Sequence, residues 1–214
     1  LSNMNQLDFG DDFNTKTKTQ TPTGLCTVNN GEYVYLPNFF QKSESDLFLK
    51  SLKENIFWKQ ESMNMYGKKV DFPRLTAWYG DNDKPYKFSG ITLQPLPWTT
   101  EILAIKNRIE PQSKVIFNSV LLNRYRDGND SISWHTDAEK ELGLNPTIAS
   151  LNFGESRRFL LRRNDDHEDK IEIRLAHGDL LIMHGELQHF WQHSVPKQAK
   201  IKDGRLNMTF RHIL

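Results

Sequence analysis

The chain has 214 residues, 37% of them hydrophobic and 26% charged, which is typical of a folded globular protein and excludes a largely disordered chain. Its formal net charge of +1 gives no overall electrostatic attraction to nucleic acid. The single cysteine, Cys26, excludes an intrachain disulfide, and the sequence holds neither an apolar run of about 18 residues nor a signal-peptide pattern, so we expect a protein of the cytoplasm, or of the nucleus in a eukaryote, with no membrane partner.

The polar composition of residues 1–24 predicts a flexible N-terminal segment, followed by a single domain at 25–214. A first helix is predicted from Ser43, because an acidic residue follows it three positions later and apolar residues continue beyond. A second helix is predicted by isoleucines at helical spacing and is expected to end at Pro111. These isoleucines are Ile102, Ile105 and Ile109.

After Pro111 the pattern changes to short β-rich segments bounded by Gly, Asp, Asn or Pro. The expected strands are 116–125, 147–153, 158–162, 171–175, 179–183, 190–195 and 205–213. Seven strands behind two helices predict a mainly β fold with flanking α-helices, in which a jelly roll or a similar β-sandwich carries an N-terminal helical buttress.

Positive charge is concentrated locally around residue 160. Arg157, Arg158, Arg162 and Arg163 lie close together, and further Lys and Arg residues stand between 197 and 205. These side chains could form a patch for nucleic acid. On charge alone, a solvated face is the commoner explanation.

The last predicted strand has a polar face and an apolar face, because successive side chains of a strand point to opposite sides. Two buried arginines on one face are costly unless an anion lies between them, and a guanidinium binds a carboxylate through two parallel hydrogen bonds. This face therefore predicts a clamp for a dicarboxylate; the alternative is an edge strand with both arginines in water. The polar face holds Arg205, Asn207, Thr209 and Arg211, and Asn123 and Tyr125 on the strand at 116–125 could complete the hydrogen bonding.

Histidine and aspartate side chains indicate a metal site. In an extended segment His135 and Asp137 point the same way, and with one further histidine they would bind one face of Fe(II) and leave three positions open. The third ligand could be His184, His189 or His193. His184 looks like a turn residue, whereas the other two have the same parity on a strand, so periodicity does not choose between them.

Seven sequence blocks, in order, resemble a known pattern: 73–80 (PRLTAWYG), 86–90 (YKFSG), 123–125 (NRY), 134–139 (WHTDAE), 148–154 (IASLNFG), 191–196 (WQHSVP) and 205–211 (RLNMTFR). The chain thereby resembles, over residues 30–214, the AlkB family of Fe(II)/2-oxoglutarate-dependent dioxygenases, which remove alkyl groups from nucleic-acid bases. Among its members the chain is similar to the animal homologues that repair DNA and RNA. The resemblance implies a double-stranded β-helix, with nucleotide recognition in residues 25–110 and a jelly-roll catalytic core in 111–214.

Carried over position by position, the resemblance implies His135, Asp137 and His193 as iron ligands, and so favours His193 over His189. It implies that 2-oxoglutarate contacts the clamp face, with Arg205 at the distal carboxylate and Arg211 nearer the iron. The residues of this co-substrate site are Asn123, Tyr125, Arg205, Asn207, Thr209 and Arg211.

The resemblance also implies a pocket for the damaged base. Tyr86 and Phe88 stand where the family has aromatic residues of this pocket, Arg74 lies in a matching segment, and Glu139 takes the place of an acidic residue near the base. Met65 and Tyr66 resemble a hairpin that some duplex-active members insert between bases. Because Tyr66 replaces a Phe and the residues after it depart from the family pattern, preference for a duplex stays open; a half-buried loop aromatic is the alternative.

The function implied is oxidative demethylation of bases such as 1-methyladenine and 3-methylcytosine, with release of formaldehyde. The co-substrates are 2-oxoglutarate and O2, the cofactor is Fe(II), and the partner is alkylated DNA, single-stranded or duplex, with RNA as a further substrate. We expect a monomer. Two other classes are open: a 2-oxoglutarate-dependent hydroxylase of a protein or small molecule, and a non-catalytic module that binds alkylated strands.

Overall fold

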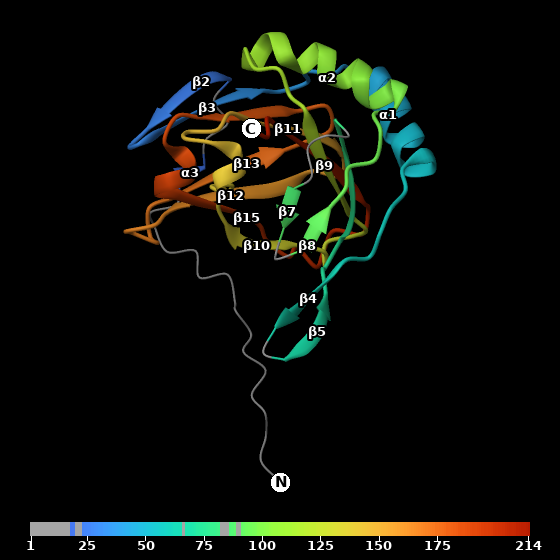
Figure 1. The fold of residues 1–214 in the computed structure, drawn as a ribbon. Coiled ribbons are helices and arrows are strands. Elements are labelled where there is room, and N and C mark those ends of the chain that lie inside the picture. Colours follow the sequence, from blue (N-terminus) through green and yellow to red (C-terminus); the bar gives the residue numbers. More distant parts are fainter. Residues whose placement is uncertain (1–17, 20–22, 66, 82–85, 89–90) are drawn as a thin grey trace.

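The computed structural model describes residues 18–19, 23–65, 67–81, 86–88 and 91–214. A seven-stranded and a five-stranded sheet pack together, and the larger one is covered on its other face by two helices (Figure 1). All strand pairs within these two sheets are antiparallel except β1 with β13. This is the mainly β architecture, with few helices, that the sequence predicts.

The larger sheet has the order β2 (Gly24–Val28), β3 (Gly31–Leu36), β14 (Leu180–His184), β11 (Ile148–Gly154), β16 (Arg205–Arg211), β9 (Ser119–Tyr125) and β6 (Leu75–Gly80). The smaller sheet has the order β1 (Lys18–Thr19), β13 (Lys170–Leu175), β12 (Arg157–Arg163), β15 (Trp191–Val195) and β10 (Ile132–His135). Two hairpins are separate: β4 (Ser62–Met65) with β5 (Lys68–Asp71), which projects from the body in Figure 1, and β7 (Tyr86–Phe88) with β8 (Ile91–Leu93).

The helices are α1 (Lys42–Asn55), α2 (Thr100–Ser113) and the short α3 (Leu187–Phe190), together with a 3-10 turn at Lys140–Leu142. Among the described residues, no helix is both long and apolar enough to cross a membrane. The isoleucines of α2 are buried against the larger sheet, as their helical spacing predicts.

Strand alternation explains why the sheets stack as they do. On β16, Leu206, Met208 and Phe210 point into the core under α1 and α2. The side chains between them face the smaller sheet and line a cavity. A second apolar core, which includes Tyr33, Leu181 and Phe159, joins the two sheets. The larger sheet is thus apolar on one face and partly polar on the other, and the polar part is where a site can form.

The structure corrects two predicted boundaries. The second helix does not end at Pro111 but continues to Ser113, so the proline lies within the last turn, where its cost is confined to the end of the helix. The helix ends where Lys114 adopts a left-handed φ of 56° and donates its N–H to the Glu110 carbonyl. The first helix begins at Lys42, one residue before the predicted start.

All seven predicted strands are present, although Phe190 ends α3 rather than beginning β15. The expectation of a flexible segment at 1–24 falls mainly on residues outside those the structure describes. Within that segment, β1 pairs with β13 and β2 begins at Gly24.

Candidate metal centre and co-substrate pocket

A cavity of about 480 Å³ lies where strands of both sheets meet the segment that carries the β4–β5 hairpin. Its walls come from β9 and β16 of the larger sheet and from β10 and β15 of the smaller sheet. Hairpin residues Met63 and Val70 contribute to its lining as well. A cavity between rigid sheet walls, with a few polar groups converging in it, is the usual form of a small-molecule site.

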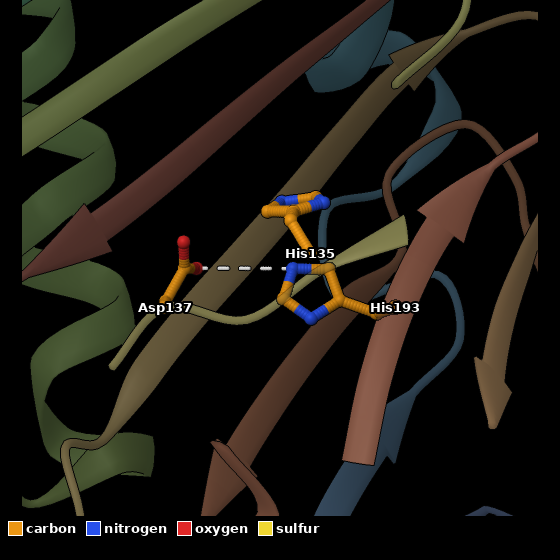
Figure 2. Close-up of side chains that lie close together, drawn as sticks. All are labelled: His135, Asp137 and His193. Atoms are coloured by element: carbon orange, nitrogen blue, oxygen red, sulfur yellow. Dashed lines mark ion pairs between the residues drawn. The ribbon is translucent and has the colours of Figure 1, made fainter. Parts of the chain in front are cut away.

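Three side chains with metal-ligating atoms converge in this cavity (Figure 2). One ligand atom from each of His135, Asp137 and His193 can be chosen so that all three lie within 4.8 Å of one another. His135 ends β10 and His193 lies opposite it on β15, so the strand ladder itself brings the two rings together. Asp137 follows two residues after His135, and its Oδ2 atom lies 3.8 Å from Nε2 of His193. Two histidines and one carboxylate are the donor set that Fe(II) takes in oxygenases.

The protonation states of these groups suit metal binding. Burial lowers the pKa of His193 to about 3, assisted by the neighbouring His135, so the imidazole is neutral near pH 7. Burial raises the pKa of Asp137, but the charge of Arg211, joined in acid by the protonated forms of the two histidines, outweighs burial and brings the pKa to about 2. Nδ1 of His135 lies 2.8 Å from the Ser133 carbonyl, which leaves Nε2 for a metal.

The two alternative histidines lie elsewhere. His189 is an exposed residue of α3, and His184 lies at the end of β14, where Nδ1 is 3.3 Å from the Thr147 hydroxyl. The sequence pattern left His189 and His193 equivalent because it assumed one strand through both. His189 lies in the helix α3, so its side chain does not follow the alternation of β15. The structure therefore brings His193, and neither of the others, to His135 and Asp137.

The predicted clamp residues line the same cavity: Asn123, Tyr125, Arg205, Asn207, Thr209 and Arg211. Arg211 lies at the metal end, with Nη2 2.9 Å from Oδ2 of Asp137. Asn207 donates to Ser150 at 2.8 Å and accepts from the Thr209 hydroxyl at 3.0 Å. These contacts fix the amide in the wall of the cavity.

Arg205 is the most demanding group of the clamp. It is 2% exposed, and its Nη2 atom donates a hydrogen bond to Oδ1 of Asn152. Nε and Nη1 are buried without a hydrogen-bond partner among the described residues. Burial lowers the pKa of the guanidinium, although the neighbouring Tyr125 raises it. Two orphaned donors on a buried cation fit a carboxylate that arrives with a ligand, and 2-oxoglutarate supplies one.

The structure describes the side chains of only two of the residues predicted for the base pocket, Arg74 and Glu139. Arg74 is buried and donates from Nε to Oδ1 of Asn123 at 2.8 Å, so it also contacts a predicted co-substrate residue. Glu139 lines the cavity, and its Oε2 atom is buried without a hydrogen-bond partner among the described residues. Tyr66 lies outside the described residues. Strands β4 and β7 contain Met65, Tyr86 and Phe88, whose side chains also lie outside the description.

Strand β12 divides the arginine cluster near residue 160 between its two faces, and only Arg158 and Arg162 stay partly exposed. Arg157 and Arg163 are buried, because they lie on the inner face of β12 with Phe159 and Leu161. Arg157 is satisfied by backbone carbonyls, including that of Asp130 at 2.8 Å. The strand alternation was itself a signal for this arrangement.

Part of the cavity wall was not predicted from the sequence. Ser150 lines the cavity, and Asn152 beside it binds Arg205. Both lie on the otherwise apolar β11, and polar residues at alternate positions of such a strand would have been the signal. Phe159, whose ring stacks on His193 at 5.4 Å between centroids, carries no sequence signal apart from its apolar character.

Comparison with known proteins gives consistent results. A family model described as the 2OG-Fe(II) oxygenase superfamily matches residues 32–211. The human protein named alpha-ketoglutarate-dependent dioxygenase alkB homolog 3 is 40% identical over 202 residues, which cover 90% of this chain and 68% of that protein. The human DNA oxidative demethylase ALKBH2 is 36% identical over 185 residues, covering 82% of this chain and 71% of that one.

A solved structure, that of OsALKBH1, has the same fold. It superposes with a TM-score of 0.61 at 20% identity, over 88% of this chain and 99% of the other. The similarity at this level of identity concerns the fold alone.

Proposed function

This chain belongs to the 2OG-Fe(II) oxygenase superfamily, and from that premise we propose that it is an oxidative demethylase of N-alkylated bases in DNA. As a member of this superfamily it is a dioxygenase that uses Fe(II) and 2-oxoglutarate. Its similarity to a protein named DNA oxidative demethylase supports a nucleic-acid substrate. The proposed substrates are bases such as 1-methyladenine and 3-methylcytosine.

One observation carries the proposal: the His/Asp/His cluster and Arg205 face the same cavity. Arg205 is buried, and two of its guanidinium nitrogens lack a hydrogen-bond partner among the described residues. His135, Asp137 and His193 would hold the metal. When bound, Fe(II) with 2-oxoglutarate and dioxygen supplies the oxidation that converts an N-methyl group into a hydroxymethyl group, while 2-oxoglutarate becomes succinate and carbon dioxide. Loss of formaldehyde from the hydroxymethyl group then restores the base.

The protein residues bind and orient the reactants. Arg205 would bind the distal carboxylate of 2-oxoglutarate through Nε and Nη1, which find no geometric hydrogen-bond partner in the described part of the chain. Arg211 holds the Asp137 carboxylate in its ionised form, ready to act as a ligand. The apolar side chains of Phe159, Met183 and Val195 line the cavity beside these groups and limit the access of water.

On the substrate side, Glu139 is the residue whose charge favours a methylated base. Bases methylated at these ring nitrogens are cations. Such a cation would stabilise Oε2 of Glu139, a buried oxygen to which none of the described residues donates a hydrogen bond. Methylation there also blocks Watson–Crick pairing, which lowers the cost of flipping the base out of a strand. Further proposals concern RNA as a substrate, the strand preference, a monomeric state and a location in the cytoplasm or nucleus.

Binding to a fluorescent single-stranded oligonucleotide carrying 1-methyladenine tests the substrate class at low salt. We expect Arg74→Ala and Tyr86→Ala to weaken binding, because the former changes the cavity wall and the latter removes a predicted stacking partner. Lys53→Ala is the matched control, since Lys53 is exposed on α1 across the larger sheet from the cavity. Absence of binding by the unaltered protein would favour a hydroxylase of a protein or small molecule.

A further inference from the structure

Asp137 is the member of the proposed iron site that no strand holds in place. His135 and His193 are paired residues of the β10–β15 ladder. Asp137 lies beyond the end of β10, in a segment with no helix or strand. Its side chain is nevertheless buried, and so is the backbone N–H that must find an acceptor. Another contact must therefore set where this carboxylate stands.

That contact comes from Gln188. Its Oε1 atom accepts the Asp137 backbone N–H at 2.9 Å, in a fully buried hydrogen bond. The Gln188 side chain is 1% exposed, and its amide nitrogen lies 3.5 Å from the sulfur of Met183, a weak acceptor. The strong hydrogen bond of this buried amide is thus the one to the ligand loop.

The position of Gln188 in the chain shows which two segments the contact connects. It lies in α3, which leads directly into β15, and is five residues before His193. The hydrogen bond therefore connects the segment that carries one proposed ligand with the loop that carries another. The hydrogen bond thereby positions Asp137, just as the strand ladder positions the two histidines.

We propose that Gln188 is a positioning residue of the metal centre, which fixes the Asp137 loop at the distance from His193 that metal binding requires. This inference rests on the proposed function, because it takes the three residues as ligands. A neutral amide suits the task, since it gives the N–H an acceptor without placing a second negative charge beside the Asp137–Arg211 ion pair. Groups that orient metal ligands in this way typically contribute about 10- to 100-fold to metal affinity.

Mn(II) binding to the metal-free protein, followed by electron paramagnetic resonance without substrate, tests the inference. Gln188→Met keeps the volume but has no strong acceptor, and we expect it to bind Mn(II) about 10- to 100-fold more weakly. Gln188→Glu keeps an oxygen acceptor at the same place, so we expect it to bind Mn(II) more tightly than Gln188→Met despite the added charge. His189→Ala, in the same short helix but exposed, should bind like the unaltered protein.

Thermal unfolding of the same metal-free proteins separates positioning from a purely structural role. Lower stability with unchanged Mn(II) affinity in Gln188→Met would overturn the inference. If that variant does not fold, Gln188→Asn replaces it, because an amide one methylene shorter cannot reach the Asp137 N–H, and unchanged affinity there would equally overturn it. Failure of the unaltered protein to bind Mn(II) would instead contradict the proposed function.

Discussion

Replacing Arg205 by methionine should stabilise the protein without its co-substrate and abolish co-substrate binding. The reason lies in the two buried guanidinium nitrogens that have no hydrogen-bond partner among the described residues. Methionine is unbranched and apolar, so it replaces the aliphatic part of the arginine side chain without bringing donors that must be satisfied. The acceptor that Arg205 leaves behind, Oδ1 of Asn152, still receives a hydrogen bond from Asn207 at 3.2 Å.

The magnitude follows from these contacts. Each unsatisfied donor costs about 1–3 kcal/mol, so removing two recovers about 2–6 kcal/mol. Against this stand one charge-assisted hydrogen bond to Asn152, about 1.5–3 kcal/mol, and the stacking of the guanidinium on Tyr125, about 1–2 kcal/mol. Because unsatisfied donors of a charged group cost more than the range used above, the balance favours the variant by about 1–2 kcal/mol, which in a chain of this size raises Tm by about 2–8 °C.

The effect on 2-oxoglutarate binding has the opposite sign. Two charge-assisted hydrogen bonds contribute about 1.5–3 kcal/mol each, so their loss should weaken binding about 100- to 10,000-fold. Thermal unfolding with and without 2-oxoglutarate measures both effects, because a ligand that binds only the folded state raises Tm. Arg174→Met, at an exposed arginine of the smaller sheet, is the control. A metal-free Arg205→Met protein less stable than the unaltered one would refute the reasoning, as would a Tm that still rises with the co-substrate.

Three further changes test other parts of the structure. Asp137→Ala should abolish Fe(II) binding, and stoichiometric iron in the purified variant would exclude Asp137 as a ligand. Truncation after Gly204 removes β16 from between β11 and β9 and should give insoluble protein; a soluble truncation that binds 2-oxoglutarate would contradict the clamp. Asp179→Ala removes a buried carboxylate that accepts from the Tyr35 hydroxyl and from two backbone N–H groups, so the free energy of unfolding should fall by about 3–5 kcal/mol. A urea midpoint unchanged from the parent would show that these donors find other partners.

The parts of the fold that could be predicted are those with a strong period in the sequence. The apolar alternation of β16 correctly separated a core face from a cavity face, and the isoleucines of α2 correctly marked a helix. Residues 24–36 form two strands that were not predicted, since many of their side chains are only partly buried. β10 was also missed, because it has only four residues and none of them is fully buried.

Without the family resemblance, the convergence of the candidate metal ligands could be expected only where these residues are neighbours in sequence. His135 and Asp137 stand two residues apart, so their convergence could be expected. Strand periodicity could not choose His193 over His189, because His189 lies in the helix α3, and that choice came from the family resemblance. Gln188 could not be identified, because its partner Asp137 is 51 residues away and the contact exists only in the folded chain.

The central claim is that this cavity demethylates bases, and formaldehyde release tests it most directly. The assay combines the protein with Fe(II), 2-oxoglutarate and a single-stranded oligonucleotide carrying 1-methyladenine or 3-methylcytosine, beside His193→Ala. We predict that formaldehyde and succinate form in equal amounts with the unaltered protein and that neither forms with the variant. Succinate without formaldehyde, or formaldehyde that persists in His193→Ala, would contradict the account.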